Sequence, residues 1–225
     1  MKNISIKLLL LTIIINFSSC KKQKSSFADY QFNNEVQVIN CGDLDNELLN
    51  EALYSFEKDF VPFYDLLQQN PIRAYNTFTK QATGKKIDPT LFASKHSVAL
   101  ANALKESGFI TGKGVNYNNP LIKCIAENMK KEGIKTTFNA LVATNSFSKQ
   151  LFNPALQTKT HKVNGDKYLS LYVALEYFYV EILKTDFTNV DFNRPKATKQ
   201  ENTKPIFNPN ANNSKVDFNK RPVKQ

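Results

Sequence analysis

The stretch that decides the fold is "YLSLYVALEYFYVEIL", residues 168–183. Apolar side chains would cover nearly the whole circumference of a helix formed by this stretch, and a helix that is apolar all round usually lies at the centre of a bundle. The stretch is shorter than the roughly 20 apolar residues that a membrane span needs, and it contains Glu176 and Glu181. The sequence therefore predicts a buried core helix that other helices surround.

A long amphipathic helix is predicted well before this stretch. Apolar residues recur there at steps of four, at Leu44, Leu48, Ala52, Phe56 and Phe60. Asp43 is the expected N-cap, and Pro62 is expected to end or kink the helix near Val61. Residues 63–69 could continue the helix for two turns, up to Asn70-Pro71.

Three further segments begin with a polar capping residue followed by proline, which is favoured at the first helical position. The pairs are Asn70-Pro71, Asp88-Pro89 and Asn119-Pro120. Each predicted helix stops near a glycine, as left-handed C-terminal caps require, at Gly84, Gly108 and Gly133. Another helix is predicted over 135–152, followed by a loop over 153–165.

Together these patterns predict an all-α fold, a single bundle of about five to six helices over residues 27–184. A brief alternation at Val36 and Val38 fits either one short strand or an extended arm. Helical periodicity is lost in residues 185–225, which are rich in Asn, Lys and Pro and are expected to form a disordered basic tail.

The start of the chain has a short apolar run, residues 4–17, with Lys2 before it and Lys7 near its beginning. A basic start, a short apolar middle and small residues at the end form the layout of a secretory signal peptide. The run ends in "FSSC", residues 17–20, which resembles the lipobox of bacterial lipoproteins. The resemblance implies a cleaved signal peptide over 1–19 and lipidation of Cys20. An uncleaved anchor helix and an ordinary secretory peptide remain as alternatives.

Residues 20–26 are polar and basic, so a flexible tether is expected behind the lipid. The membrane would then be one partner of the protein, through acyl chains that anchor far more firmly than a single chain does. In the lipoproteins that the start resembles, an acidic residue after the cysteine favours the inner membrane, and Lys21 is not acidic. The resemblance therefore implies the outer membrane of a Gram-negative envelope, with either face open.

The net charge of +10 and pI near 9.4 do not predict nucleic-acid binding. The signal peptide carries +2, the tether +3 and the tail +4, which leaves +1 for residues 27–184. A near-neutral folded part does not fit a domain that binds phosphate backbones. Arginine, the residue preferred for bidentate phosphate contacts, occurs only at positions 73, 194 and 221.

Two cysteines remain beside Cys20, and the envelope is an oxidising compartment. Cys41 and Cys124 could form a disulfide, or they could be two buried thiols that behave as small apolar groups.

The tail contains a near repeat. "VDFNRPK" at 190–196 returns as "VDFNKRPVK" at 216–224. The two copies could be paired short binding motifs for an envelope protein, with Phe192 and Phe218 as anchors and Arg194 and Arg221 as charge contacts. The alternatives are a relic of duplication, or one copy that folds back on the domain.

Residues for catalysis or metal binding are few. The two histidines, His96 and His161, have no paired spacing, and "TGKG" at 111–114 does not complete a phosphate-binding loop. We therefore expect no enzyme activity, cofactor or metal. The leading hypothesis is a lipid-anchored adaptor or structural protein of the envelope. One alternative is a small-ligand binder with a tyrosine-lined pocket near Glu176, which a cavity of several hundred cubic ångströms would favour. Another is a diverged hydrolase in which carboxylates such as Glu127 and Glu176 converge.

Overall fold

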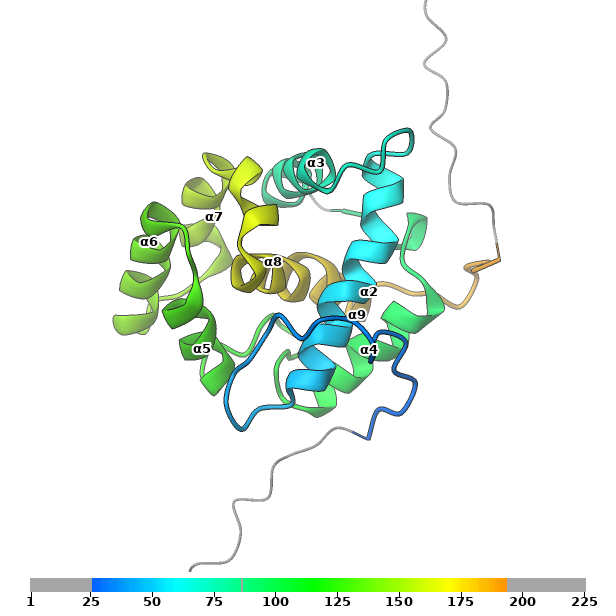
Figure 1. The fold of residues 1–225 in the computed structure, drawn as a ribbon, viewed down its shortest axis with the longest axis horizontal. Coiled ribbons are helices and arrows are strands. Elements are labelled where there is room, and N and C mark those ends of the chain that lie inside the picture. Colours follow the sequence, from blue (N-terminus) through cyan, green and yellow to red (C-terminus); the bar gives the residue numbers. More distant parts are fainter. Residues whose placement is uncertain (1–25, 86, 194–225) are drawn as a thin grey trace, which may run out of the picture.

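The computed structural model describes residues 26–85 and 87–193, and this part of the chain is all-helical, as predicted (Figure 1). The only β pairing within these ranges is one isolated bridge between Ile110 and Val115. The expected signal peptide, Cys20 and the tail beyond Asn193 lie outside the described residues. None of the described helices has the length and apolar character needed to cross a membrane.

The elements follow one another along the chain in a fixed order. They are α2 (Asn46–Tyr64), α3 (Pro71–Gly84), the 3-10 turn η1 (Pro89–Leu91), α4 (Lys95–Glu106), α5 (Pro120–Asn128), α6 (Glu132–Ala143), α7 (Lys149–Gln157), the 3-10 turn η2 (Thr160–Gly165), α8 (Lys167–Ala174), the π-helical turn η3 (Leu175–Tyr179) and α9 (Val180–Leu183).

The predicted core helix is the run α8, η3 and α9, which lies in the middle of the molecule with the other helices around it (Figure 1). Residues 169–180 of this run are all buried, as an all-round apolar helix requires. Its N-cap, Asp166, is also fully buried, and its carboxylate accepts hydrogen bonds from the backbone N–H of Leu169, Lys130 and Lys131.

The core is rich in aromatic rings. Phe56 on α2 stacks on Phe60 at 4.2 Å between ring centroids, and it meets Tyr75 and Phe78 of α3 and Phe178 of the central run. The buried apolar side chains form one continuous cluster. Such close ring packing stabilises the fold beyond simple burial, by about 0.5–1.5 kcal/mol for each favourable pair.

Several helix boundaries agree with the sequence. The side chains of Asn70, Asp88 and Asn119 cap α3, η1 and α5. Gly108 has a φ of +73°, the left-handed conformation expected after α4.

Other boundaries were wrong. Asp45, not Asp43, caps α2. Pro62 does not end α2, which continues to Tyr64, within the stretch that the sequence left open as a continuation. Gly133 does not end a helix but lies in the first turn of α6.

The region around residues 88–165 also divides differently from the prediction. The helix expected after Asp88 is a single 3-10 turn, and α4 begins separately behind its own cap, Ser94. The helix expected over 135–152 is two helices, since Asn145 adopts a φ of +54° and Ser148 caps α7. The loop expected over 153–165 is partly helical, in α7 and η2.

The N-terminal arm, residues 26–41, contains no strand and is irregular, with a turn in which the N–H of Glu35 donates to the carbonyl of Phe32 at 3.0 Å. It crosses the front of α2 before the chain turns into that helix (Figure 1).

Candidate functional site

Glu176 faces the protein interior and not an open pocket. Its side chain is buried, and Oε2 accepts hydrogen bonds from the backbone N–H of Val115 at 3.2 Å and the hydroxyl of Tyr117 at 2.9 Å. Burial raises the pKa of this carboxyl, although the two hydrogen bonds and the charge of Lys149 act in the lowering direction. Glu176 therefore ties the loop before α5 to the central helix.

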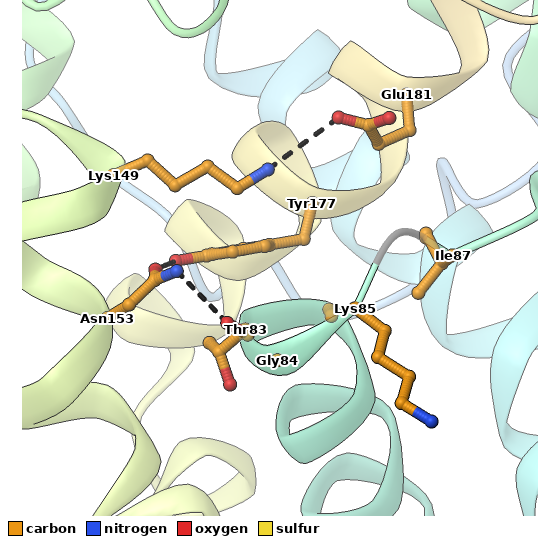
Figure 2. A pocket seen from close by; sticks show the side chains of 9 residues that line it. Thr83, Gly84, Lys85, Ile87, Lys149, Asn153, Tyr177 and Glu181 are labelled. Atoms are coloured by element: carbon orange, nitrogen blue, oxygen red, sulfur yellow. Dashed lines mark hydrogen bonds and ion pairs between the residues drawn. The ribbon is translucent and has the colours of Figure 1, made fainter.

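A pocket of about 320 Å³ opens next to Tyr177 and Glu181, one residue and five residues further along the central helix (Figure 2). It lies between the end of α3, the start of α7 and the run η3–α9. The residues that line it are Ala82, Thr83, Gly84, Lys85, Ile87, Lys149, Asn153, Tyr177 and Glu181. Its size is at the lower end of the range for small-molecule sites.

Opposite charges face each other on one side of this pocket. Lys149 Nζ lies 3.6 Å from Oε1 of Glu181 and 4.7 Å from the centre of the Tyr177 ring (Figure 2). Oε1 of Glu181 also accepts a hydrogen bond from Lys184 at 3.3 Å. The Glu181 side chain is only 9% exposed, whereas that of Lys149 is 28% exposed. The carboxylate of Glu181 is therefore part of the buried wall of the pocket, and the ammonium of Lys149 approaches it from the more exposed rim.

Hydrogen bonds hold the three walls together. The Tyr177 hydroxyl donates to Oδ1 of Asn153, and Nδ2 of Asn153 donates to the carbonyl of Thr83 at 3.2 Å (Figure 2). Because these residues belong to η3, α7 and α3, the pocket is preformed and does not depend on one flexible loop. Tyr177 also lies within the π-helical turn, a feature that is frequent at functional sites.

The N-terminal arm is fastened to the domain at several points. The carboxylate of Glu51 on α2 accepts the backbone N–H of Gln31 at 2.7 Å and of Phe32 at 2.9 Å. Oδ1 of Asn50 accepts the N–H groups of Val38 and Ile39, and its amide donates to the carbonyl of Ile39. This irregular segment is thus held by two buried side chains of α2, those of Glu51 and Asn50.

Cys41, at the end of this arm, forms a disulfide with Cys124 on α5, with the two Cα atoms 5.6 Å apart. Of the two alternatives that the sequence left open, the structure contains the bridge. It closes a loop of 83 residues between the arm and the other side of the bundle.

Of the four tail residues proposed as a motif, Phe192 is described and Arg194, Phe218 and Arg221 are outside the described residues. The Phe192 ring stacks on Phe187 at 6.0 Å between centroids, and Phe187 packs against the core. The first copy of the motif therefore begins on the domain surface.

The sequence prediction did not find Lys149, Asn153 or Thr83. They lie on elements that only tertiary packing brings together, and none has a local motif. The spacing of Tyr177 and Glu181, four residues apart on one helical face, was the available signal. Among the described residues, no group of three or more His, Cys, Asp or Glu side chains is arranged to hold a metal ion.

Comparisons with known proteins found no matching family model and no significant similarity to a curated protein or a solved structure.

Proposed function

We propose that this chain is a lipid-anchored, non-enzymatic protein of the outer membrane of a Gram-negative envelope, and that its helical domain is an adaptor or structural element. The lipobox-like "FSSC" and the basic tether motivate the anchor. The single observation that supports the adaptor is the fastened arm between tether and bundle. Residues 26–41 are held by Glu51 and Asn50 and end in the Cys41–Cys124 disulfide.

This arrangement suits a protein that transmits force between a bilayer and a partner. A force applied at Cys20 would be transmitted along the tether to the arm. The Cys41–Cys124 disulfide would then transmit this force from the arm to α5 without unfolding α2. The tail leaves the other end of the chain and would reach envelope partners through its two VDFN copies. Two linked motifs raise the apparent affinity for a divalent partner by effective concentration.

Membrane attachment is tested with a Cys20→Ala variant expressed in a Gram-negative host fed clickable palmitate. The parent should be labelled and should sediment with outer membranes, and the variant should be unlabelled and released. A variant that still sediments, together with an unlabelled parent, would refute the anchor. The adaptor role is tested by cross-linking and pull-down with the full chain and with a variant truncated after residue 193. A partner that the full chain captures should be lost from the truncated variant.

A second candidate function is small-ligand binding. The sequence suggested this function as an alternative, with a tyrosine-lined pocket near Glu176. One observation favours it, the preformed pocket between α3, α7 and the central helix. The ligand would contact Tyr177 and Glu181 and not Glu176, whose carboxylate is bound inside the fold.

A further inference from the structure

The pocket beside Tyr177 combines two opposite charges with an apolar wall, and this combination limits what it can bind. Glu181 and Lys149 supply the charges. Ala82, Ile87 and the ring of Tyr177 are all buried side chains that line the same pocket. At Gly84 a side chain would meet nothing within 4 Å, so the space next to the end of α3 is open.

The ion pair in this pocket is loose. Lys149 Nζ and Glu181 Oε1 are 3.6 Å apart, longer than the 2.7–2.9 Å of a good charge-assisted hydrogen bond. Both groups therefore keep hydrogen-bonding capacity that a ligand can use. Lys149 approaches from the rim with its side chain partly exposed, so it can turn toward a ligand without disturbing the core.

A ligand with one charge fits this site poorly. A simple anion would pair with Lys149 and lie beside the nearly buried carboxylate of Glu181, a like charge that Lys184 alone would then balance. A simple cation would meet the ammonium of Lys149. Leaving a buried charge without its partner is costly. A ligand with both charges close together replaces the Lys149–Glu181 pair by two closer ion pairs, one with each side chain. Both Lys149 and Glu181 then keep a partner of opposite charge.

From this geometry we propose that the pocket binds a small zwitterion, a free apolar α-amino acid of the size of leucine. Its ammonium pairs with Glu181, its carboxylate pairs with Lys149, and its side chain packs on Ile87 and Ala82. The volume of about 320 Å³ admits such a molecule. This assignment rests on the second candidate function and gives it a ligand class.

The test titrates the full-length protein, purified in detergent with methyl-labelled isoleucine, with three matched probes. L-leucine has both charges, 4-methylpentanoate lacks the ammonium, and L-leucinamide lacks the carboxylate. The readout is the saturable shift of the Ile87 methyl resonance and the heat of binding. L-leucine should saturate the site, and each of the other two probes should bind at least about tenfold more weakly, since each loses one charge-assisted pair.

Two variants and one control connect the binding to the pocket. Glu181→Gln and Lys149→Met should each weaken L-leucine binding about tenfold or more. Lys123→Met should leave it unchanged, because Lys123 and Glu127 form a similar ion pair at 3.8 Å on the exposed surface of α5. If a variant fails to fold, the comparison of the three probes on the parent protein still tests whether the pocket requires both charges of the ligand.

Saturation by 4-methylpentanoate or L-leucinamide but not by L-leucine would overturn the zwitterion assignment and leave a ligand pocket in place. No saturable shift with any of the three probes would overturn the assignment as well. The adaptor proposal is judged separately, by the pull-down with and without the tail.

Discussion

The carboxylate of Glu51 lies 2.7 Å from Nε2 of His96, and the same carboxylate holds the backbone of the N-terminal arm. Glu51 is on α2 and His96 on α4, so three segments meet at one buried acid. The other ring nitrogen of His96 faces Asp29 of the arm at 3.3 Å. The rings of Phe27 and Phe32, also from the arm, lie beside the imidazole. The arm is therefore attached through polar groups that only a folded pair of helices can provide.

Replacing Glu51 by alanine should detach the arm. The substitution leaves the N–H groups of Gln31 and Phe32 and the ring of His96 without their acceptor, and we expect the free energy of unfolding to fall by about 3 kcal/mol. Urea unfolding measures this change, and hydrogen exchange of residues 27–35 should show faster opening, whereas Val38 and Ile39 stay bound to Asn50. The exposed Glu127→Ala is the control and should change stability by less than about 0.5 kcal/mol. A Glu51→Ala protein with parent stability and an equally protected arm would contradict this role.

Breaking the disulfide should destabilise the whole domain. The bridge closes a loop of 83 residues, for which the chain-entropy model gives about 4.5 kcal/mol. The double variant Cys41→Ser with Cys124→Ser should lose this amount in chemical unfolding under oxidising conditions. The free energy of unfolding of the parent in strong reductant should equal that of the double variant. Such agreement would show that the loss comes from the missing disulfide and not from the serine side chains. Alkylation of both thiols in native, unreduced protein would refute the bridge.

The sequence predicted the helical class and many helix starts because those signals are local. A capping side chain such as Asn70 or Asn119 bonds to N–H groups two or three residues away, so the pattern is visible in a few letters. The central run was also predictable, since a helix with no polar face must be buried.

The wrong boundaries depend on contacts between distant residues. Helix α5 ends at Asn128, well before Gly133, and the backbone N–H groups of Lys130 and Lys131 bond to Asp166, 36 and 35 residues away. Similarly, α4 starts at Lys95 because its cap Ser94 is positioned by the buried Asp59, whose carboxylate accepts the Ser94 N–H at 2.7 Å. The pocket was not predictable for the same reason, since its walls come from α3, α7 and α9.

The buried carboxyl of Glu176 should make stability depend on pH. Its pKa is raised in the folded state, so the folded protein holds this proton more tightly than the unfolded chain does. The contribution of this group to the free energy of unfolding is therefore largest at low pH, and it is lost as pH rises from the unfolded value of 4.5 through the folded pKa. Glu176→Gln mimics the protonated form and can still accept from Val115 and Tyr117.

We therefore expect the stability of Glu176→Gln relative to the parent to increase as pH rises from about 4.5 through the raised pKa of Glu176 in the folded protein. Urea unfolding at several pH values measures this difference. Glu127→Gln, at an exposed position, should show no such trend. A Glu176→Gln variant whose stability relative to the parent falls as pH rises would mean that the carboxylate is favoured in the fold.

The two VDFN copies of the tail should act together if they bind an envelope partner. Phe192 stacks on Phe187 at an interplanar angle of 12°, so the first copy is presented from the domain surface. Phe192→Ala and Phe218→Ala should each weaken partner binding by about tenfold or more, and the double variant should abolish it, since avidity requires both copies. Fluorescence anisotropy of a labelled 185–225 peptide against an envelope extract, and pull-down with the full chain, measure this. Thr188→Ala is a control for the local turn, because its hydroxyl bonds only to Asp186 among the contacts that the structure shows. Binding that survives both phenylalanine substitutions would leave the repeat without a role in recognition.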